Sequence, residues 1–345
     1  MTIKWTGRVE KHTDTTGEKQ DYGIEENMEL LEDYYEPLTV IATSDDDGKT
    51  VREVLEKAFG VSSKLLAAAR TTDYGLTINE ERVYISAPVR TGEAVRLRQL
   101  REQSEDILPQ SMPLSIVYED NELLVVNKPA GMIVHPTHGH YTNTLANGVV
   151  AYWNEKNERF RFRPIHRLDE ETSGLVVIAK NAYIHHQLSE QMQQGKVDKY
   201  YMALVYGVPK PSQTMIDAPI DRDPLNPHLR VVTPDGYPSQ TLYTVQQSFM
   251  WKDDEEVSLV KLKLITGRTH QIRVHMQSIG HPLIGDKLYG NRRIAELESS
   301  ISRHALHAQS IRFIHPKTKQ LMECHAPIPE DFQNILNKMQ EGTQK

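Results

Sequence analysis

Hydrophobic residues first recur at helical spacing between residues 51 and 59. The positions on this stripe are Val51, Val54, Leu55, Ala58 and Phe59. Thr50 and Glu53 have the spacing of a capping box, and Gly60 can end a helix in the left-handed conformation. The pattern therefore predicts a helix over 51–59, and a second helix from Ser62 through the following LLAAAR.

Short strands are predicted after these helices, in TTDYGLTINEERVYISAPVRTGEAVRL, with turns at Gly75, Asn79 and Gly92. Two helices followed by strands in so short a stretch make a small module and not half of a large domain. We place this α/β module at residues 46–100 and predict a proline-containing linker at residues 101–113.

From Ser115 onward, strands dominate the pattern. The predicted strands are SIVYED, ELLVVNKP, GLVVIAK, YYMALVYG, TLYTVQQS and EEVSLVKLKLITG. Helices are predicted between them, near LANGVVAYW, AYIHHQLSEQMQQG and THQIRVHMQSIG. Because strands and helices do not alternate regularly, a mixed α+β sheet is favoured over a doubly wound parallel one, in a domain at residues 114–340.

Charge is distributed unevenly along the chain of 345 residues, whose net charge is −7. Residues 1–40 contain four basic and ten acidic groups and no sustained periodicity, so residues 1–45 are predicted to be a flexible acidic tail. The rest of the chain is close to neutral. It can still present a basic groove to nucleic acid, because phosphate contacts depend on local arrangement.

Composition excludes several classes of protein. The single cysteine, Cys324, excludes an intrachain disulfide and a zinc site with two thiolates from one chain. No stretch approaches the roughly 18 apolar residues of a membrane helix, and the first residues lack the apolar run of a secretory signal. We therefore expect a cytoplasmic protein without a membrane segment. Neither GxGxxG nor a P-loop occurs, so nothing here calls for a nucleotide cofactor.

The segment RFRFRPIHRLD has the most unusual local composition of the chain. Arg159, Arg161 and Arg163 alternate with Phe160 and Phe162, so an extended backbone would put the guanidinium groups on one face and the rings on the other. Such a basic edge can contact phosphates. An ordinary solvated strand face explains the pattern equally well.

A carboxylate and a second basic cluster follow. Asp169 precedes a Thr-Ser-Gly turn that leads into an apolar strand, which is a position from which a side chain can project into a cleft. Downstream, TGRTHQIRVH carries Arg268, His270, Arg273 and His275, and the spacing of its arginines favours a transition from loop to helix. Taken alone, a solvated acidic turn remains the simpler interpretation of Asp169.

The fifteen histidines raise the alternative of a metal site, above all His135, His138 and His140 in HPTHGH. A catalytic zinc ion usually takes three protein ligands and a water. However, no HExxH occurs, and the Gly and Pro residues around these histidines suit a tight loop equally well. Structural or RNA-contacting roles are therefore favoured, and no metal is predicted.

Five ordered segments together change the interpretation. HRLDEETSGLVVIAK resembles the signature of the RluA family of pseudouridine synthases, and VVNKPAGMIVHPTHGH is similar to an earlier family segment. KYYMALVYG, LITGRTHQIRVHMQSIGHPLIGDKLYG and LHAQSIRFIHP resemble the later ones, in the same order. The resemblance spans roughly Ser115 to Phe332. It implies a mixed, largely antiparallel sheet with a central cleft, and isomerisation of uridine to pseudouridine in RNA.

The resemblance also implies roles for individual residues. The catalytic residues would be Asp169, Tyr201 and Arg273. Asp169 would be the catalytic carboxylate, Tyr201 would contact the flipped uridine and take part in proton transfer, and Arg273 would pair with Asp169. Arg167 would take the place of the extruded base in the RNA stack. The remaining candidates for RNA contact are His166, Arg159, Arg161, Arg163, Arg268, His270, Lys64 and Arg70.

The module at 46–100 is similar in layout to the S4-like RNA-binding domain that often precedes this catalytic domain. Such modules usually have an arginine-rich second helix and an Asn-Gly turn. Here the corresponding places are Ser62-Ser63-Lys64 and Asn79-Glu80. This sequence therefore departs from the usual S4-like pattern at the residues that would bind RNA, and the departure weakens the expectation that the module alone binds RNA tightly.

The predicted reaction rearranges one nucleoside without redox change, so it requires no cofactor. The predicted partner is RNA, with large-subunit ribosomal RNA favoured over transfer RNA, and the predicted oligomeric state is a monomer. Two other classes stay open: an RNA-binding or ribosome-assembly protein with an inactive synthase domain, and a histidine-based metallohydrolase.

Overall fold

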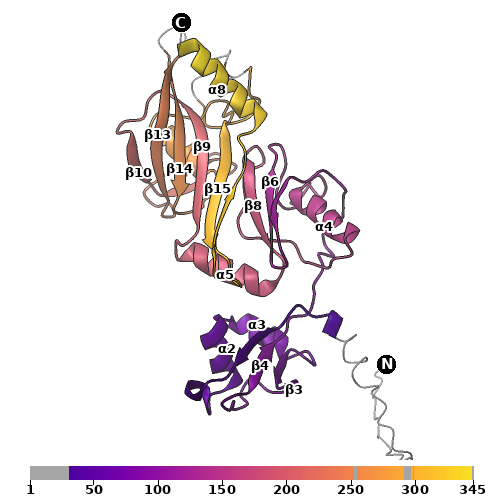
Figure 1. Ribbon diagram of the computed structural model, residues 1–345. Coiled ribbons are helices and arrows are strands. Elements are labelled where there is room, and N and C mark those ends of the chain that lie inside the picture. Colours follow the sequence, from indigo (N-terminus) through magenta and orange to yellow (C-terminus); the bar gives the residue numbers. More distant parts are fainter. Residues whose placement is uncertain (1–30, 252–254, 291–296, 298, 344–345) are drawn as a thin grey trace, which may run out of the picture.

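The computed structural model describes residues 31–251, 255–290, 297 and 299–343. A small module and a large sheet domain follow one another along the chain (Figure 1). The mixed α+β class predicted from the sequence is confirmed. No helix in these residues is both long and apolar enough to cross a membrane.

The module consists of two helices packed on a four-stranded sheet with strand order β1-β4-β2-β3. Its elements are β1 (Leu38–Ile41), η1 (Ser44–Asp46), α2 (Val51–Phe59), α3 (Ser63–Ala69), β2 (Leu76–Ile78), β3 (Glu81–Arg82) and β4 (Ala94–Leu97). The predicted capping box is present, because the Thr50 side chain accepts a hydrogen bond from the Glu53 amide and Gly60 ends α2 with φ +59°. Both predicted helices are thus confirmed, with Ser62 as the N-cap of α3.

The module begins earlier than residue 46. Residues 1–30 of the predicted tail lie outside the described residues, but Leu38–Ile41 pairs in antiparallel register with β4 from Leu38↔Leu97 to Ile41↔Ala94. The prediction of a tail through residue 45 is therefore wrong over this stretch. A four-residue edge strand is too short to show a periodicity beside an acidic segment.

The sheet domain contains most of the strands. They are β5 (Ile116–Glu119), β6 (Leu123–Lys128), β7 (Arg163–Pro164), β8 (Ser173–Ala179), β9 (Asp198–Tyr206), β10 (Gln213–Asp217), β11 (Ile220–Arg222), β12 (Arg230–Val232), β13 (Gln240–Met250), β14 (Glu256–Leu264), β15 (Leu306–Ile314) and β16 (Leu321–His325). The helices are α4 (Leu145–Glu155), α5 (Ala182–Gln193), α6 (Gln271–Ser278) and α8 (Glu330–Thr343).

The large sheet has the strand order β10-β13-β14-β9-β15-β8-β6-β5, and its pairs are antiparallel except for β15 with β8. These two strands touch only through His307↔Ser173 and Ala308↔Gly174. Gly174 has φ +117°, and a Cβ there would lie 2.3 Å from the Ala308 carbonyl oxygen. The glycine of the Thr-Ser-Gly turn is thus required where the two halves of the sheet meet.

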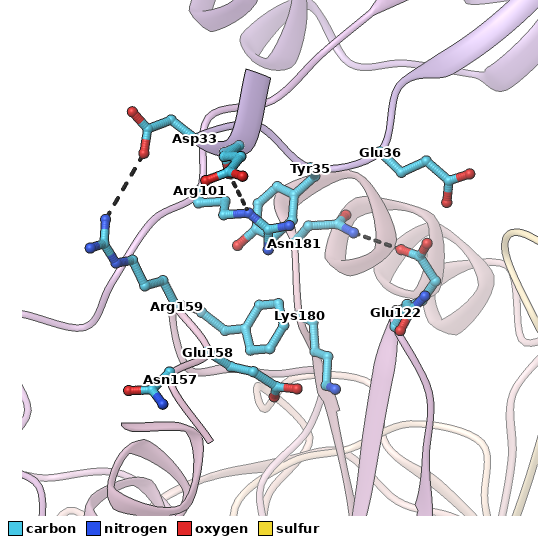
Figure 2. A pocket seen from close by; sticks show the side chains of 13 residues that line it. Asp33, Tyr35, Glu36, Arg101, Glu122, Asn157, Glu158, Arg159, Lys180 and Asn181 are labelled. Carbon is cyan, nitrogen blue, oxygen red and sulfur yellow. Dashed lines mark hydrogen bonds and ion pairs between the residues drawn. The ribbon is translucent and has the colours of Figure 1, made fainter. Parts of the chain in front are cut away.

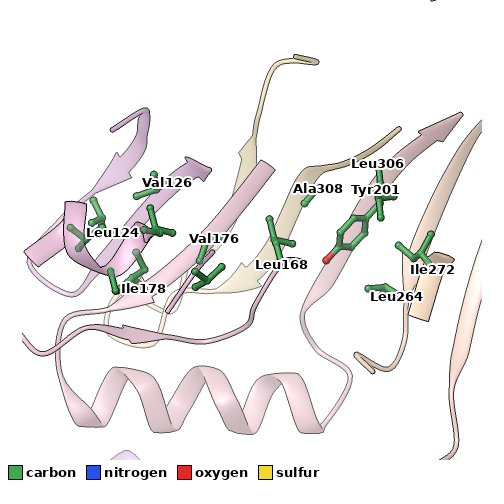
Figure 3. Packing of buried hydrophobic residues seen from close by; sticks show 14 of the residues in the cluster. Leu124, Val126, Leu168, Val176, Ile178, Tyr201, Leu264, Ile272, Leu306 and Ala308 are labelled. Carbon is green, nitrogen blue, oxygen red and sulfur yellow. The ribbon is translucent and has the colours of Figure 1, made fainter. Parts of the chain in front are cut away.

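Both faces of the sheet are covered. Side chains alternate along β9, so that Tyr201, Ala203 and Val205 pack with α4 and α6 on one face. Met202 and Leu204, on the other face, pack with α8. Figure 3 shows the first of these cores, in which Leu168 lies between Val176 and Tyr201.

The module and the sheet domain share a hydrophobic core. Leu55 and Leu66 of the module belong to the same buried cluster as Val177 and Leu188 of the sheet domain. The predicted linker, residues 101–113, has no helix or strand and runs along α4, where the Gln110 amide donates to the Asn147 carbonyl at 3.1 Å.

Candidate active site

Asp169 lies in a tight turn directly before β8. The Thr172 amide donates to the Asp169 carbonyl at 3.1 Å, which closes the turn. Leu168 on its other side is buried in the core. The Asp169 side chain keeps 28% of its surface exposed. A carboxylate on a rigid turn between a buried anchor and a strand is both accessible and fixed in direction.

Two buried basic side chains hold the backbone of this turn. Lys128 has no exposed surface, and its Nζ donates to the carbonyls of Glu170 (3.0 Å), Pro129 (2.8 Å) and Met132 (2.7 Å). Arg303 donates from Nη1 to the Glu171 carbonyl at 3.2 Å. Burial lowers the pKa of Lys128 to about 7, so its amine is only partly charged near neutral pH. The two residues after Asp169 are therefore fixed by hydrogen bonds from two buried basic side chains.

The hydroxyl groups of the Thr-Ser pair are held by two histidines. Thr172 Oγ1 lies 2.7 Å from His304 Nε2, and Ser173 Oγ lies 2.9 Å from His307 Nδ1. Burial lowers the pKa of His304 to about 3 and that of His307 to about 4, so both rings are neutral near pH 7. A neutral imidazole can donate one hydrogen bond to a hydroxyl or accept one from it, and it adds no charge near Asp169.

Arg273 is oriented by a second carboxylate. Its Nε and Nη2 donate to the two oxygens of Asp286 at 2.8 Å each, and its Nη1 points to Asp169 Oδ2 at 3.4 Å. The predicted contact between Arg273 and Asp169 is present, but the tighter, bidentate pair is with Asp286.

Asp286 is a functional candidate that sequence reasoning missed. Its side chain has no exposed surface, and it also accepts from the amides of Leu288 and Tyr289. Burial alone would raise the pKa of Asp286, but the hydrogen bonds and charge of Arg273 reverse this and lower it. The only signal in the sequence is an aspartate in GDKLYG, at the end of the segment that contains Arg273.

Tyr201 lies on β9 with 5% of its surface exposed, next to Leu168 (Figure 3). Burial raises the pKa of its phenol, and the negative charge of Asp169 raises it further. The hydroxyl is therefore protonated near neutral pH. The Tyr201 ring is therefore suited to pack against a nucleobase while its hydroxyl donates a hydrogen bond. A protonated phenol is less suited to act as a general base.

His270 faces Asp169 from the N-cap position, directly before α6. It has φ +57°, and its Nε2 lies 3.9 Å from Asp169 Oδ2. Its Nδ1 lies 2.8 Å from the Tyr289 hydroxyl, which accepts from the Arg230 amide at 2.9 Å. If Tyr289 donates its own proton to Nδ1, every group is satisfied and the ring proton sits on Nε2, toward Asp169.

The other residues near Asp169 differ in their placement. Arg167 is exposed, two positions before Asp169. His166 turns inward, where its Nε2 accepts from the Val177 amide at 3.4 Å and burial lowers its pKa to about 3. The structure thus gives His166 the place of a neutral structural residue and not of a phosphate contact. Arg268 lies 5.4 Å over the Tyr237 ring, on the outside.

The alternating arginines do not form one surface. Phe160 and Phe162 are buried, as the pattern predicted, but only Arg163 of the three arginines is in a strand. Arg159 lies 3.9 Å from Asp33 in one pocket, whereas Arg161 and Arg163 line a different one. The phenylalanines anchor the segment, and its changing direction separates the arginines.

Lys64 and Arg70 of the module are exposed on and just after α3. Lys64 lines the same cavity as Arg161 and Arg163, whereas Arg70 does not. This cavity is at the border between the module and the sheet domain, and its lining does not include Asp169.

The histidine loop has no metal-binding geometry. His138 Nδ1 lies 3.4 Å from the Tyr141 hydroxyl, and His135 Nδ1 lies 3.2 Å from the Pro136 carbonyl. Within the described ranges, no group of three or more His, Cys, Asp or Glu side chains is arranged to hold a metal ion. This arrangement gives no support to the metallohydrolase alternative.

The fold and site together define a class of protein. A largely antiparallel sheet with helices on both faces carries one accessible aspartate, which faces an arginine and a histidine from α6 and lies near a buried tyrosine. An accessible carboxylate held in a fixed direction beside basic groups is an arrangement that an enzyme can use for acid–base or nucleophilic chemistry.

Comparison with known proteins agrees with this class. Residues 122–278 match the family described as RNA pseudouridylate synthase. A Bacillus subtilis (strain 168) protein named uncharacterized RNA pseudouridine synthase YhcT is 35% identical over 298 residues, which are 86% of this chain and 96% of the relative. Ribosomal large subunit pseudouridine synthase D of Yersinia pestis is 35% identical over 310 residues, 86% of this chain and 93% of that protein.

A solved structure, human RNA Pseudouridylate Synthase Domain Containing 1, is 27% identical with a TM-score of 0.51, and the match covers 68% of this chain and 98% of that one. The chain therefore belongs to the RNA pseudouridine synthases, in the RluA family that its motifs indicated. It is an isomerase that acts on RNA.

Proposed function

We propose that this enzyme isomerises specific uridines of structured RNA, with large-subunit ribosomal RNA favoured over transfer RNA, and that Asp169 is its catalytic residue. The proposal for the substrate is supported by relatives named ribosomal large subunit pseudouridine synthase D. The observation that carries the mechanism is the placement of the Asp169 carboxylate. It is fixed on a hydrogen-bonded turn and partly exposed beside Arg273 and His270.

The reaction breaks the bond between N1 and C1′, turns the uracil, and joins C5 to C1′. The proton that leaves C5 is balanced by one that N1 gains, so reactant and product are isomers. Asp169 could attack the sugar, add to the base or assist cleavage of the glycosidic bond, and each route needs an ionised, aimed carboxylate. Retaining glycosidases are a precedent for a carboxylate that bonds to a sugar carbon.

The two carboxylates around Arg273 have separate tasks in this proposal. Asp286 takes two of the guanidinium donors and fixes the plane of the group, which leaves Nη1 for Asp169. Since Asp286 holds the guanidinium plane, Arg273 presents Nη1 to Asp169 from a fixed direction. Asp286 is therefore a positioning residue that acts through Arg273.

The uridine has to leave the RNA stack to reach Asp169, which costs a few kcal/mol. Arg167 is exposed two residues away, and its planar guanidinium can stack in the vacated place and contact a phosphate. Tyr201 offers its ring and a protonated hydroxyl to the flipped base from the other side.

The substrate proposal is tested with RNA labelled with tritium at C5 of uridine, because isomerisation releases this hydrogen. The purified full chain is incubated with transcripts of large-subunit ribosomal RNA and of transfer RNA. We expect tritium release from the ribosomal transcript, at positions that are then mapped by sequencing. Release from transfer RNA alone would contradict the substrate, and RNA binding without any release would support an inactive synthase domain.

A further inference from the structure

A cavity of about 700 Å³ lies between the module and the sheet domain. Its module side is formed by α3, and its other side by α5 and the segment that leads into β7. The polar residues that matter here are Lys64, Arg98, Arg161, Arg163, His185 and His186. We call this cavity the interdomain groove.

The groove is lined by four basic residues and one acidic residue, Glu102. Two of the cations are held in place, because Arg163 pairs with Glu102 and Arg98 pairs with Glu80 at 2.6 Å. Lys64 and Arg161 are exposed and have no carboxylate within 4.0 Å in the part of the chain that the structure describes. The groove therefore offers two uncompensated cations beside two that are fixed.

We propose that the interdomain groove binds the sugar–phosphate backbone of the substrate RNA, at a distance from the uridine that reacts. The inference rests on the proposed function, since it concerns the same RNA. Phosphate contacts by lysine and arginine supply most of the sequence-independent affinity of nucleic-acid complexes. His185 and His186 on α5 add ring nitrogens that can form hydrogen bonds to the groove, and burial lowers the pKa of His185.

A neighbouring pocket has the opposite balance of charge. This pocket has a volume of about 570 Å³, and its lining side chains are drawn in Figure 2. Arg101 lines this pocket, whereas the next residue, Glu102, lines the groove. The pocket is lined by five acidic and three basic residues, and Arg159 is engaged there with Asp33. A phosphate backbone would be repelled from this pocket and attracted to the groove.

The groove supplies the cations that α3 lacks. The sequence has Ser62-Ser63-Lys64 where modules of this layout usually have several arginines. In the structure, Arg161 and Arg163 of the sheet domain stand across the groove from Lys64. The RNA-binding surface is thus shared between the two domains and is not a property of the module alone.

The strand β8 sets the distance from the groove to the reacting site. Asp169 precedes one end of β8, at Ser173, whereas Arg163 pairs with Ala179 at the other end. Seven residues of strand separate these ends by roughly 20 Å, at about 3.3 Å per residue. The groove therefore contacts RNA that flanks the target and not the flipped uridine.

The module is fixed on α5, so this distance does not change freely. The Tyr183 hydroxyl donates to the Phe59 carbonyl at 3.3 Å, and Gln187 Nε2 donates to the Phe59 and Gly60 carbonyls at 3.2 and 3.1 Å. A fixed second contact favours RNA that is long and structured enough to reach both places. Short hairpins can fill only the site around Asp169.

The test compares two RNAs, a structured transcript of large-subunit ribosomal RNA and a short hairpin cut from it around a modified uridine. Binding by the full-length K64E/R161E double variant is measured as a function of salt. We expect at least a tenfold loss of affinity for the long transcript and a loss below twofold for the hairpin. Losing two phosphate contacts should also lower the salt slope for the long RNA by about 1.4–1.8.

The matched control is K210E, a charge reversal at an exposed lysine between β9 and β10. It should bind both RNAs like the unaltered enzyme. An unchanged affinity and salt slope of K64E/R161E for the long transcript would overturn the proposal that the groove binds RNA. Equal losses of affinity for the two RNAs would also overturn it. Failure of the unaltered enzyme to release tritium from either RNA would instead refute the proposed function, because binding is measured independently of turnover.

Discussion

At the scale of single residues, the environment of Asp169 is set by ionisable groups that do not touch the substrate. Lys128 and Arg303 hold the backbone of its turn, and Asp286 directs Arg273 toward it. Each of these groups is buried and fully engaged. Removing one partner of such a pair leaves an uncompensated charge, which costs more than the pair contributes.

Asp286→Asn should reveal this positioning role. Loss of the charged partner leaves Arg273 uncompensated, so we expect the free energy of unfolding to fall by about 3–5 kcal/mol and turnover to fall strongly. Stability is measured by urea titration and turnover by tritium release from RNA.

A second variant separates positioning from stability. Arg273→Met/Asp286→Leu removes both buried charges, so most of the folding free energy should return while turnover stays low. Turnover of Asp286→Asn at the level of the unaltered enzyme would contradict the role assigned to Asp286.

The neutral histidines make stability depend on pH. The pKa of His304 is lowered to about 3 in the folded state, while the unfolded chain has the ordinary value of about 6.5, so the unfolded state binds more protons between these values. Its contribution is present above pH 6.5 and is lost as the pH falls. When the pH falls from 7 to 5, the contribution of His304 to the free energy of unfolding should fall by about 2 kcal/mol.

His304→Gln tests that sign. Glutamine keeps a hydrogen-bonding group for Thr172 but does not titrate, so the difference in unfolding free energy between pH 7 and pH 5 should shrink by about 2 kcal/mol. His228→Gln, at an exposed histidine, should leave the difference unchanged. An undiminished difference in His304→Gln would show that His304 is not buried as a neutral ring.

At the scale of elements, the site depends on the place where β8 and β15 meet. Only two residue pairs join these strands, and Gly174 allows their close approach. The Asp169 turn enters the sheet at this point, and the Thr172 and Ser173 side chains bind histidines next to β15 and in it. Any change that separates β8 from β15 should therefore also displace the carboxylate.

Gly174→Ala should destabilise the fold by more than its backbone strain. A Cβ would meet the Ala308 carbonyl oxygen at 2.3 Å, so a clash of about 1–3 kcal/mol adds to a strain of similar size. Gly195→Ala is the matched control, because Gly195 has φ +67° with no atom within 4 Å of its Cβ. Equal losses of stability and activity in the two variants would refute the close approach.

Much of this element-level arrangement could be predicted from the sequence. The capping box and Gly60 marked α2 correctly, and the ordered motifs indicated the family. The predicted contact between Asp169 and Arg273 is also present, at 3.4 Å. Asp286, His304 and His307 could not be singled out, because their partners are far away in sequence and each residue alone has an ordinary interpretation. Contacts of this kind depend on the packing of the sheet and not on local spacing.

At the scale of the whole molecule, the module and the sheet domain are joined by a common core and by hydrogen bonds to α5. The sequence predicted separate domains with a linker. It could not show that apolar residues such as Leu55 and Leu188 belong to one cluster. The interdomain groove was equally hidden, since Lys64 and Arg161 are brought together only by this docking.

The common core predicts coupled unfolding. Leu55 is fully buried in the module, whereas Trp153 and Trp251 both lie in the sheet domain. In a Trp5→Phe background, Leu55→Ala should lower the free energy of unfolding that tryptophan emission reports in a urea titration, by the roughly 2–5 kcal/mol typical of such a cavity. A change seen by circular dichroism but not by tryptophan emission would mean that the module unfolds by itself.

The most direct measurement is the rate at which Asp169→Asn enzyme releases tritium from RNA labelled at C5 of uridine, beside Glu171→Gln as a neighbouring acid that is exposed. The amide keeps the shape of the side chain and removes its charge. We predict that Asp169→Asn binds RNA and folds normally but releases no tritium, while Glu171→Gln retains its rate. Release by Asp169→Asn at the rate of the unaltered enzyme would contradict the account.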